Sequence, residues 1–379
     1  MAAAPDVEST TVPVIVIVVG TRPEAIKLAP LIHALRRNTA LRSIVVNSGQ
    51  HLPAVRHCLA GFGIDCDNAL PALPAMQNLG VASRHLRHAL RTLLHRMAPA
   101  AVVVQGDTLT AYAGARAGFD LALPVAHVEA GLRTSDVADP FPEEWFRRRI
   151  ARYARWHFAP CRSAETNLLA EGIAPMDIFR VGNTGIDSLR ALLDRHRIRP
   201  GLQRTRNVMV TLHRRENWDA KAEIFCDALI ELAQRHPDLR MIFPLHPNPR
   251  IARRIRRRLG SHLAIALVDP IEYPEFVRMM AEAALVISDS GGIQEEVPHL
   301  GTPLLVPRSN TERPEGIATG FVRLVDVDCQ CIVEAATALL ALPSRAPLPI
   351  DAHAPFGAGD AAERIAGVLE RVLVPASAQ

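Results

Sequence analysis

The sequence predicts an α/β fold of two Rossmann-like domains, each a doubly wound parallel sheet. Strand-length apolar runs alternate with helical segments along most of the 379 residues, which is typical of βαβ units. The runs are continuous rather than alternating, as in parallel sheets that are covered on both faces. The pattern starts again near residue 205, after an Arg-rich stretch at 194–206. We therefore expect residues 1–182 to form one domain and residues 183–357 to form a second.

The first domain opens with the apolar run VPVIVIVV, which has the length of a single strand. Similar runs follow at SIVV, AAVVV and PVAHV, with helical patterns between them. The sequence thus predicts strands at 14–19, 43–46, 100–104 and 124–128, and helices at 24–36 and 111–119.

The second domain repeats this alternation from NVMVTL onward. Ligands of such open sheets bind beyond the carboxyl ends of the strands, where the strand order reverses. With two such domains, we expect the site in the cleft between them. The expected strands are 207–212, 240–245, 263–268, 284–288 and 303–307, with helices at 222–234 and 361–372.

Composition and charge exclude several classes of protein. No apolar run approaches the about 20 residues that span a bilayer, and the first residues lack the basic start of an export signal, so we expect a cytoplasmic protein. The six cysteines form no CxxC pair, only a CxC at Cys329 and Cys331, which argues against zinc. The net charge is +4. Two Arg clusters lie at 147–155 and 253–258, but aromatic residues make up only 4% of the chain, too few for base stacking, which argues against nucleic-acid binding.

The segment GTRPEAIK follows the first predicted strand. Thr21 can cap the helix that begins here, and Pro23 suits its first turn. Arg22 and Lys27 add two cations near a helix N-terminus, which already attracts anions. Lys27 is one of only two lysines in the chain, which suggests that a compact ammonium group is needed there. The missing GxGxxG motif argues against a dinucleotide cofactor, so we expect no cofactor.

Acidic residues follow the next strand ends of the first domain. QGDT contains Asp107, HVEAGLRT contains Glu129, and PFPEEWFRR contains Glu143 together with Arg147. Any one of these acids could form a structural salt bridge instead. As a set, carboxyl groups beside cations suit proton transfer next to an anionic ligand.

The motif HRREN follows the first strand of the second domain. His213 with two arginines suits a diphosphate, because charge-assisted hydrogen bonds to phosphate are strong. His246, in FPLHPNP, lies in another loop after a predicted strand, and a single loop histidine is weak evidence for a binding site.

The motif SDSGGIQEE follows the strand expected at 284–288. Gly291 and Gly292 would let backbone N–H groups approach a ligand, and with Ser290 they would cradle phosphate at a helix that begins near residue 293. Glu295 or Glu296 could accept hydrogen bonds from ribose. The second domain is therefore predicted to bind a nucleoside diphosphate.

Taken in order, these motifs resemble the non-hydrolysing UDP-N-acetylglucosamine 2-epimerase family. The resemblance covers residues 18–365 and rests on GTRPEAIK, QGDT, HVEAGLRT, HRREN, SDSGGIQEE and TERPE. It implies a GT-B-like fold, a homodimer, and a last helix at 358–379 that returns to complete the first domain. It also implies the interconversion of UDP-GlcNAc and UDP-ManNAc without metal or NAD. In that reaction the C2 proton is lost, UDP departs, and an enzyme-bound 2-acetamidoglucal remains until UDP adds back.

The matching motifs imply a role for individual residues. Asp107, Glu129 and Glu143 are the acid and base candidates, and either Asp107 or Glu143 would remove the C2 proton. Lys27, Arg147 and His213 would support the sugar and the leaving diphosphate. The residues assigned to substrate and UDP are Arg22, Phe276 beside the uracil, Ser290, Gly291, Gly292, Glu296 and Arg313.

Two departures from the family pattern concern substrate and regulation. PEEWFRRRIA has Phe146 where the family has Asn, and Ala151 where it has Asp, which would remove a hydrogen-bonding side chain beside the sugar. PAMQNLG lacks a basic residue of members that bind a second substrate molecule as an activator, although Gln50, Arg214 and His246 match parts of that allosteric site.

Four alternatives stay open. The substrate could be a modified UDP-sugar such as UDP-2,3-diacetamido-2,3-dideoxyglucuronic acid, although that branch carries GARPQ and QKE where this chain has GTRPE and QEE. The enzyme could instead hydrolyse its substrate to ManNAc and UDP, or act as a GT-B glycosyltransferase. A regulator that binds nucleotide sugars without turnover is the non-enzymatic alternative. The expected partner is a UDP-sugar, with no nucleic acid and no membrane.

Overall fold

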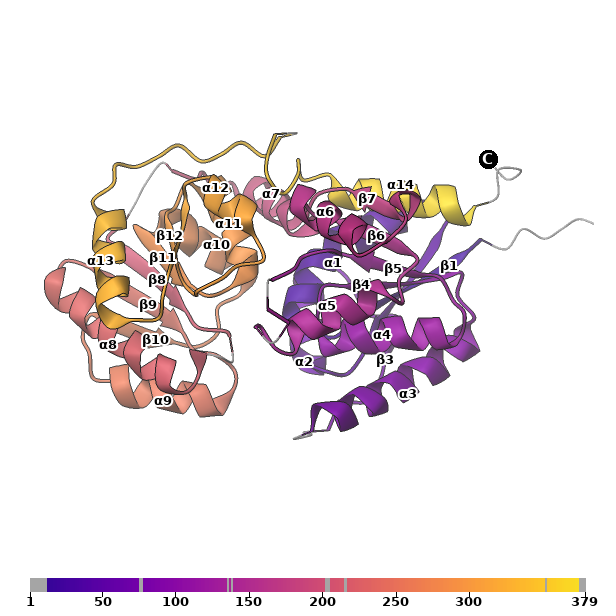
Figure 1. Cartoon of the computed structure of the whole chain (residues 1–379), viewed down its shortest axis with the longest axis horizontal. Helices are drawn as coiled ribbons and strands as arrows, with labels where there is room; N and C mark the ends of the chain where they lie inside the picture. Colours follow the sequence, from indigo (N-terminus) through magenta and orange to yellow (C-terminus); the bar gives the residue numbers. More distant parts are fainter. Residues whose placement is uncertain are drawn as a thin grey trace, which may run out of the picture. The chain divides into compact units, whose positions relative to one another are not determined.

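The computed structural model of the chain describes residues 12–74, 78–134, 136–137, 139–201, 205–214, 217–351 and 353–374. The chain divides into two compact units. Unit 1 comprises Met1–Gly131, Trp145–Thr184 and Asp360–Gln379, and unit 2 comprises Leu132–Glu144 and Gly185–Gly359. Each is built on a parallel sheet with helices between successive strands (Figure 1). The prediction of two Rossmann-type α/β domains is therefore confirmed.

Among the described residues, the sheet of unit 1 has seven strands in the order β3-β2-β1-β4-β5-β6-β7, and all neighbouring pairs are parallel. The strands are β1 (Val14–Val19), β2 (Arg42–Asn47), β3 (Asn68–Ala69), β4 (Ala101–Gln105), β5 (Val125–Val128), β6 (Trp156–Ala159) and β7 (Ile178–Arg180). The helices are α1 (Arg22–Arg37), α2 (Leu52–Gly61), α3 (Leu79–Met97), α4 (Leu109–Asp120), α5 (Glu143–Ala151), α6 (Arg162–Ala170), the short 3₁₀ helix η1 (Pro175–Asp177) and α14 (Ala361–Leu373).

The continuous apolar run of β1 serves two cores, one on each face of the sheet. Ile15 and Ile17 join the cluster that contains α1 and α2, whereas Val16 and Val18 join the cluster that contains α3, α4 and α5. Successive side chains of a strand point to opposite faces. A strand covered on both faces therefore has no position for a polar residue, which explains the run.

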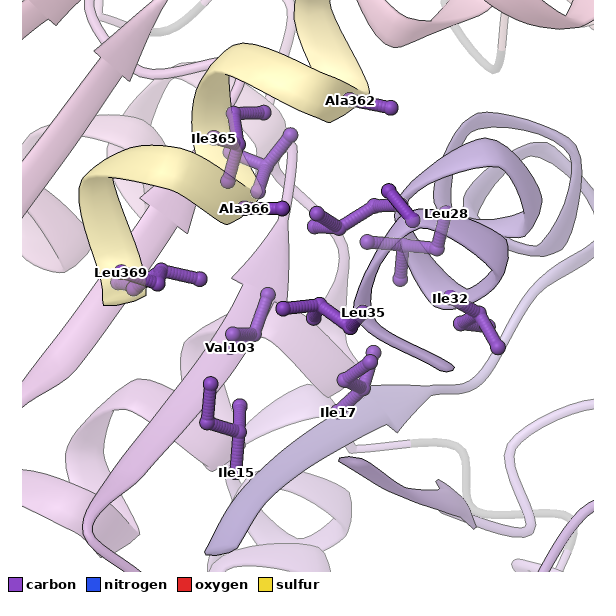
Figure 2. Close-up of a cluster of buried hydrophobic side chains, with 14 of the residues drawn as sticks. Ile15, Ile17, Leu28, Ile32, Leu35, Val103, Ala362, Ile365, Ala366 and Leu369 are labelled. Carbon is purple, nitrogen blue, oxygen red and sulfur yellow. The ribbon is translucent and has the colours of Figure 1, made fainter. Parts of the chain in front are cut away.

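The last helix, α14, packs on unit 1. Ile365, Ala366 and Leu369 belong to the same buried cluster as Leu28 and Leu35 of α1. Figure 2 shows these side chains of α14 facing those of α1, with Ile15 and Ile17 of β1 beneath them. Helix α14 thus closes one face of the first sheet, although the 175 residues from 185 to 359 separate the C-terminal segment from the rest of that unit.

The described part of unit 2 has six parallel strands in the order β10-β9-β8-β11-β12-β13. Its main core packs α8, α9 and α13 on β8, β9 and β11. The strands are β8 (Asn207–Thr211), β9 (Arg240–Pro244), β10 (Ile265–Val268), β11 (Leu285–Ser288), β12 (Leu304–Pro307) and β13 (Val322–Val325). The helices are α7 (Thr184–His196), which begins at the unit boundary, α8 (Ala220–Arg235), α9 (Pro249–Leu259), α10 (Tyr273–Glu282), α11 (Gly291–Leu300), α12 (Pro314–Ala318) and α13 (Cys329–Leu340).

Both sheets reverse their strand order at a defined point. In unit 1 the order runs outward from β1 to β3 and then restarts at β4 beside β1; in unit 2 it restarts at β11 beside β8. These are the positions where open α/β sheets bind ligands. The motifs GTRPEAIK and QGDT follow β1 and β4, and HRREN and SDSGGIQEE follow β8 and β11.

One segment groups differently from the expected domain boundaries. Residues 132–144 were assigned to the first domain, which was expected to span 1–182, but they group with unit 2. A hydrogen bond of 2.8 Å from Asn310 Nδ2 to Asp139 Oδ2 is one contact that ties this segment to unit 2.

Within the ranges that the structure describes, no helix is long and apolar enough to cross a membrane.

Candidate active site

The loop after β1 begins α1 with a capping box. The Thr21 hydroxyl accepts the backbone N–H of Glu24, and the Glu24 side chain accepts the backbone N–H of Thr21, so two donors at the helix start are satisfied reciprocally. Arg22 is the first helical residue, and Lys27 lies in the second turn. The capping box therefore places both predicted cations near the N-terminus of α1.

Glu24 itself was not predicted as a site residue, yet it is fully buried. One carboxylate oxygen accepts the N–H groups of Gly20 (2.9 Å) and Thr21 (2.6 Å). The other accepts the hydroxyl of Thr108 at 2.7 Å. Burial raises the pKa of Glu24 to about 7, although these hydrogen bonds oppose the shift. The sequence contains a signal that could have identified Glu24, because Thr21 and Glu24 have the T-x-x-E spacing of a capping box.

Glu129 gathers three donors around one oxygen. Lys27 Nζ, Gln105 Nε2 (2.9 Å) and Asn183 Nδ2 (3.2 Å) all bond to Glu129 Oε2. Its backbone has φ of +64°, a left-handed conformation that is uncommon for a residue other than glycine. Strained backbone of this kind gathers at functional sites. Two of the predicted residues, Lys27 and Glu129, thus meet, and Gln105 and Asn183 are additions that the sequence reading missed.

Asp107 forms an ion pair with Arg147 of α5. The Arg147 side chain is 4% exposed, whereas that of Asp107 is 27% exposed. The Asp107 carboxylate is therefore accessible to solvent, and the buried guanidinium of Arg147 holds it in place. Glu143 is half-buried and lies four residues before Arg147 on α5, a spacing that places both on one side of the helix. The structure thus brings Asp107 and Arg147 together as the sequence implied.

In unit 2, a buried carboxylate joins the loops after β8 and β11. Asp289 is fully buried and accepts the backbone N–H groups of His213 (2.8 Å) and Arg214 (3.0 Å) and the amide of Asn217 (2.9 Å). Asp289 was part of the quoted motif SDSGGIQEE but was not predicted as a site residue. Its contacts position His213 beside the start of α11.

Helix α11 begins at Gly291, two residues before the expected start, with Ser290 at its N-cap. The Ser290 side chain makes no capping hydrogen bond. A Cβ at Gly291 would lie 2.3 Å from Arg313 Nη1, whereas a Cβ at Gly292 would meet nothing within 4 Å. Gly291 is therefore needed for the close approach of Arg313, and Gly292 leaves open space beside the backbone of the helix start.

Buried ion pairs surround this helix start. Arg313 donates to Glu295 at 2.6 Å and Arg214 donates to Glu312 at 2.6 Å, while Arg308 and Arg313 form ion pairs with Glu312 at 3.0 and 2.6 Å. Three arginines thus face two carboxylates, and burial lowers the pKa of Arg308. With Asp289, three carboxylates balance these three arginines, and the N-terminus of α11 is the feature that suits a bound anion.

Glu296 and Phe276 extend this site to α10. Glu296 is 8% exposed and accepts the Tyr273 hydroxyl at 2.9 Å. Phe276 lies on α10, one turn after Tyr273, and is half-buried. Tyr273 was not predicted; the sequence gives no signal for this contact, because Tyr273 and Glu296 lie on different helices.

The three candidates for an allosteric site have partners within their own units. Gln50 accepts the N–H and the hydroxyl of Thr110 (3.1 and 2.7 Å). Arg214 pairs with Glu312, and the His246 ring lies 5.0 Å from that of Trp218 and 5.9 Å from that of His213. Residues 215–216 of HRREN and 75–77 of PAMQNLG lie outside the described residues.

Phe146 requires a correction. It was expected to lie beside the sugar, where it would replace a hydrogen-bonding side chain. Its side chain is instead 3% exposed and packs in the core of unit 1, stacked on Tyr112 at 5.0 Å. The reason is helical geometry: Phe146 precedes Arg147 on α5 and so points to a different side of the helix.

The described residues contain no cluster of His, Cys, Asp and Glu that could hold a metal ion.

Comparison with known families decides what these motifs belong to. A family model described as UDP-N-acetylglucosamine 2-epimerase matches residues 33–370. The chain belongs to the UDP-N-acetylglucosamine 2-epimerase family. It is 40% identical over 365 residues to the UDP-N-acetylglucosamine 2-epimerases of Yersinia pestis and of Escherichia coli (strain K12), and each match covers 93% of this chain and 97% of the relative.

Solved structures of this epimerase family resemble the whole chain. The UDP-GlcNAc 2-epimerase of Neisseria meningitidis, bound to UDP-GlcNAc, has a TM-score of 0.88 at 34% identity, over 94% of this chain and 100% of that one. The enzyme of Methanocaldococcus jannaschii, in complex with UDP-GlcNAc and UDP, has a TM-score of 0.85 at 31% identity, over 94% and 99%. The expected GT-B-like fold is confirmed by this similarity.

Proposed function

We propose that this member of the epimerase family interconverts UDP-GlcNAc and UDP-ManNAc without hydrolysing them. A base removes the proton from C2 while the C1–O bond breaks, which releases UDP and leaves 2-acetamidoglucal with a C1–C2 double bond. UDP then adds back to C1, and an acid delivers a proton to the opposite face of C2. The observation that supports this most is the placement of the family motifs at the strand-order reversals of both sheets.

The proton-transfer groups of this proposal lie in unit 1, except Glu143, which groups with unit 2. Asp107 or Glu143 acts on C2, and Glu129 completes the set of acids. The partly exposed carboxylate of Asp107, held by a buried Arg147, meets the need of a general base for a fixed but reachable position. Lys27, held by Glu129, and Arg22 at the start of α1 would stabilise negative charge as the leaving group departs.

Unit 2 binds UDP in this proposal. Ser290, Gly291 and Gly292 present the N-terminus of α11 to the diphosphate, with His213 and Arg313 adding donors and charge. The open space beside Gly292 at the N-terminus of α11 supports an anion there. Glu296 would accept from the ribose hydroxyls, and Phe276 would lie beside the uracil.

Regulation and assembly belong to the same proposal. Gln50, Arg214 and His246 are proposed as part of an activator site for a second UDP-GlcNAc, and the chain is proposed to form a homodimer. The resemblance to the family supports both the activator site and the homodimer. Light scattering measures the mass of the protein in solution and so tests the dimer. A sigmoidal dependence of the initial rate on UDP-GlcNAc concentration would show activation by a second UDP-GlcNAc molecule.

The function is tested by identifying the products formed from UDP-GlcNAc by the purified protein. We expect UDP-ManNAc at equilibrium with UDP-GlcNAc, without free sugar. ManNAc and UDP would show the hydrolysing reaction instead, and turnover only in the presence of an acceptor sugar would show a glycosyltransferase. Faster turnover of a modified UDP-sugar than of UDP-GlcNAc would show that alternative substrate, because the chain lacks the family's Asn at position 146.

A further inference from the structure

Glu24 is a buried acid that the proposed reaction does not use. It is 0% exposed, and its described partners are the N–H groups of Gly20 and Thr21 and the hydroxyl of Thr108. A buried charged group without a cation is costly unless hydrogen bonds compensate for the lost water. The three hydrogen bonds of Glu24 provide this compensation.

Glu24 joins two loops that carry predicted site residues. Gly20 and Thr21 end the segment after β1 and lead directly into Arg22 and Lys27. Thr108 follows Asp107 and is the N-cap of α4, where its hydroxyl also accepts the N–H of Ala111 at 3.0 Å. Strands β1 and β4 are neighbours at the point where the strand order reverses. The carboxyl group therefore bridges this point from one loop to the other.

We propose that Glu24 is a positioning residue, whose carboxyl group clamps the loop after β1 to the loop after β4 and thereby fixes Asp107. This inference rests on the proposed epimerase function for the role of Asp107. The clamp itself rests only on contacts within unit 1. A base that is misplaced by about 1 Å can lose about a hundredfold in rate, so holding this loop is a catalytic contribution without contact to substrate.

The clamp tolerates a change in the protonation of Glu24. In the carboxylate, both oxygens accept, and Thr108 donates. In the acid, the oxygen that faces Thr108 can donate to its hydroxyl oxygen, while the other oxygen still accepts from Gly20 and Thr21. A Gln side chain has the same pattern as the acid, because its carbonyl accepts and its amide donates. An Ala side chain would leave two buried N–H groups without an acceptor.

The activity test compares E24A, E24Q, T108V and T108S with wild type. We expect E24A and T108V to lower kcat about tenfold to a hundredfold with little change in KM or UDP affinity, while E24Q and T108S retain most of kcat because they keep the bridge. The control is E363Q, the same change as E24Q at an exposed Glu on α14, which should leave kcat unchanged.

Hydrogen exchange tests the clamp without reference to activity. T108V should increase deuterium uptake in the peptide that spans residues 18–24, although Thr108 lies 84 residues away in the chain, and T108S should not. This measurement separates the two proposals. If T108V takes up more deuterium than wild type at residues 18–24 while wild type does not epimerise UDP-GlcNAc, the proposed function is contradicted and the clamp stands.

Three results would overturn the inference. The first is a folded E24A, or T108V if E24A does not fold, with kcat within about twofold of wild type. The second is an equal loss of kcat in E24Q and E24A, since the effect would then follow the ionisable carboxyl rather than the bridge. The third is unchanged exchange at residues 18–24 in T108V.

Discussion

At the residue scale, two buried carboxylates organise the strand-order reversals of the two sheets. Glu24 accepts backbone N–H groups after β1, and Asp289 accepts those after β8. In each case the acid connects the loops of two neighbouring strands. Loops that carry predicted site residues are thus held by buried carboxylates that accept hydrogen bonds, while Asp107 stays partly exposed.

Replacing Asp107 by Asn should separate chemistry from binding. The amide keeps the size of the carboxylate but cannot take a proton, so turnover of UDP-GlcNAc should fall about a hundredfold to ten-thousandfold. Affinity for UDP, measured by calorimetry, should stay unchanged because Asp107 is not among the residues proposed to bind UDP. Near-normal turnover would remove Asp107 from the set of acids and leave Glu143 as the base.

Replacing Glu296 by Ala should weaken UDP binding. A charge-assisted hydrogen bond contributes about 1.5–3 kcal/mol, which corresponds to a Kd about tenfold to a hundredfold higher. The matched control is Tyr273→Phe, which removes the hydroxyl that Glu296 accepts but keeps the carboxylate. If both variants weaken UDP binding equally, the role of Glu296 lies in its contact with Tyr273 and not in its contact with ribose.

Glu24 should make stability depend on pH. Its pKa is about 7 in the folded chain, against 4.5 as the ordinary value, so the folded state binds the proton more tightly. This contribution is fully present below about pH 4.5 and is lost as the pH rises through about 7. Relative to E24Q, wild type should therefore lose about 3 kcal/mol of unfolding free energy across this window. Urea denaturation at several pH values measures it, and a constant difference between the two proteins would contradict it.

At the element scale, the sequence predicts nine of the strands that the structure describes and misses β3, β6, β7 and β13. β1 and β4 were expected within one residue of their bounds, because unbroken apolar runs mark strands covered on both faces. β6 and β7 were not predicted: β7 has only three residues, and β6 directly follows the Arg-rich segment 147–155, so no apolar run stands out there. The start of α11 was placed two residues late, although Ser290 is a good N-cap residue.

Helix α14 should be part of the stability of unit 1. Leu369 is 0% exposed in the cluster with α1, so Leu369→Ala should lower the free energy of unfolding by about 2–5 kcal/mol. Val372 on the same helix is 38% exposed, and Val372→Ala serves as the control with an effect below about 1 kcal/mol. Equal effects of the two substitutions in urea denaturation would contradict the packing of α14 described above.

At the scale of the whole molecule, local motifs predict where the site lies, but long-range contacts determine how it is held. The position of Asp107, Glu129 or Ser290 after a strand is visible in the sequence. The contacts of Glu24 with Thr108 and of Glu296 with Tyr273 are not, since they join segments 84 and 23 residues apart. Phe146 is a different case. It was expected beside the sugar because it departs from a family motif, but its side chain packs in the core.

The central claim is that the chain epimerises C2 of UDP-GlcNAc through loss and return of its proton. The most direct test is proton NMR of UDP-GlcNAc with the purified protein in D₂O. The account predicts that UDP-ManNAc appears and that the C2 proton signal disappears from both UDP-sugars as deuterium replaces it. UDP-ManNAc that retains its C2 proton, or a UDP-GlcNAc that stays unchanged while UDP still binds, would contradict it.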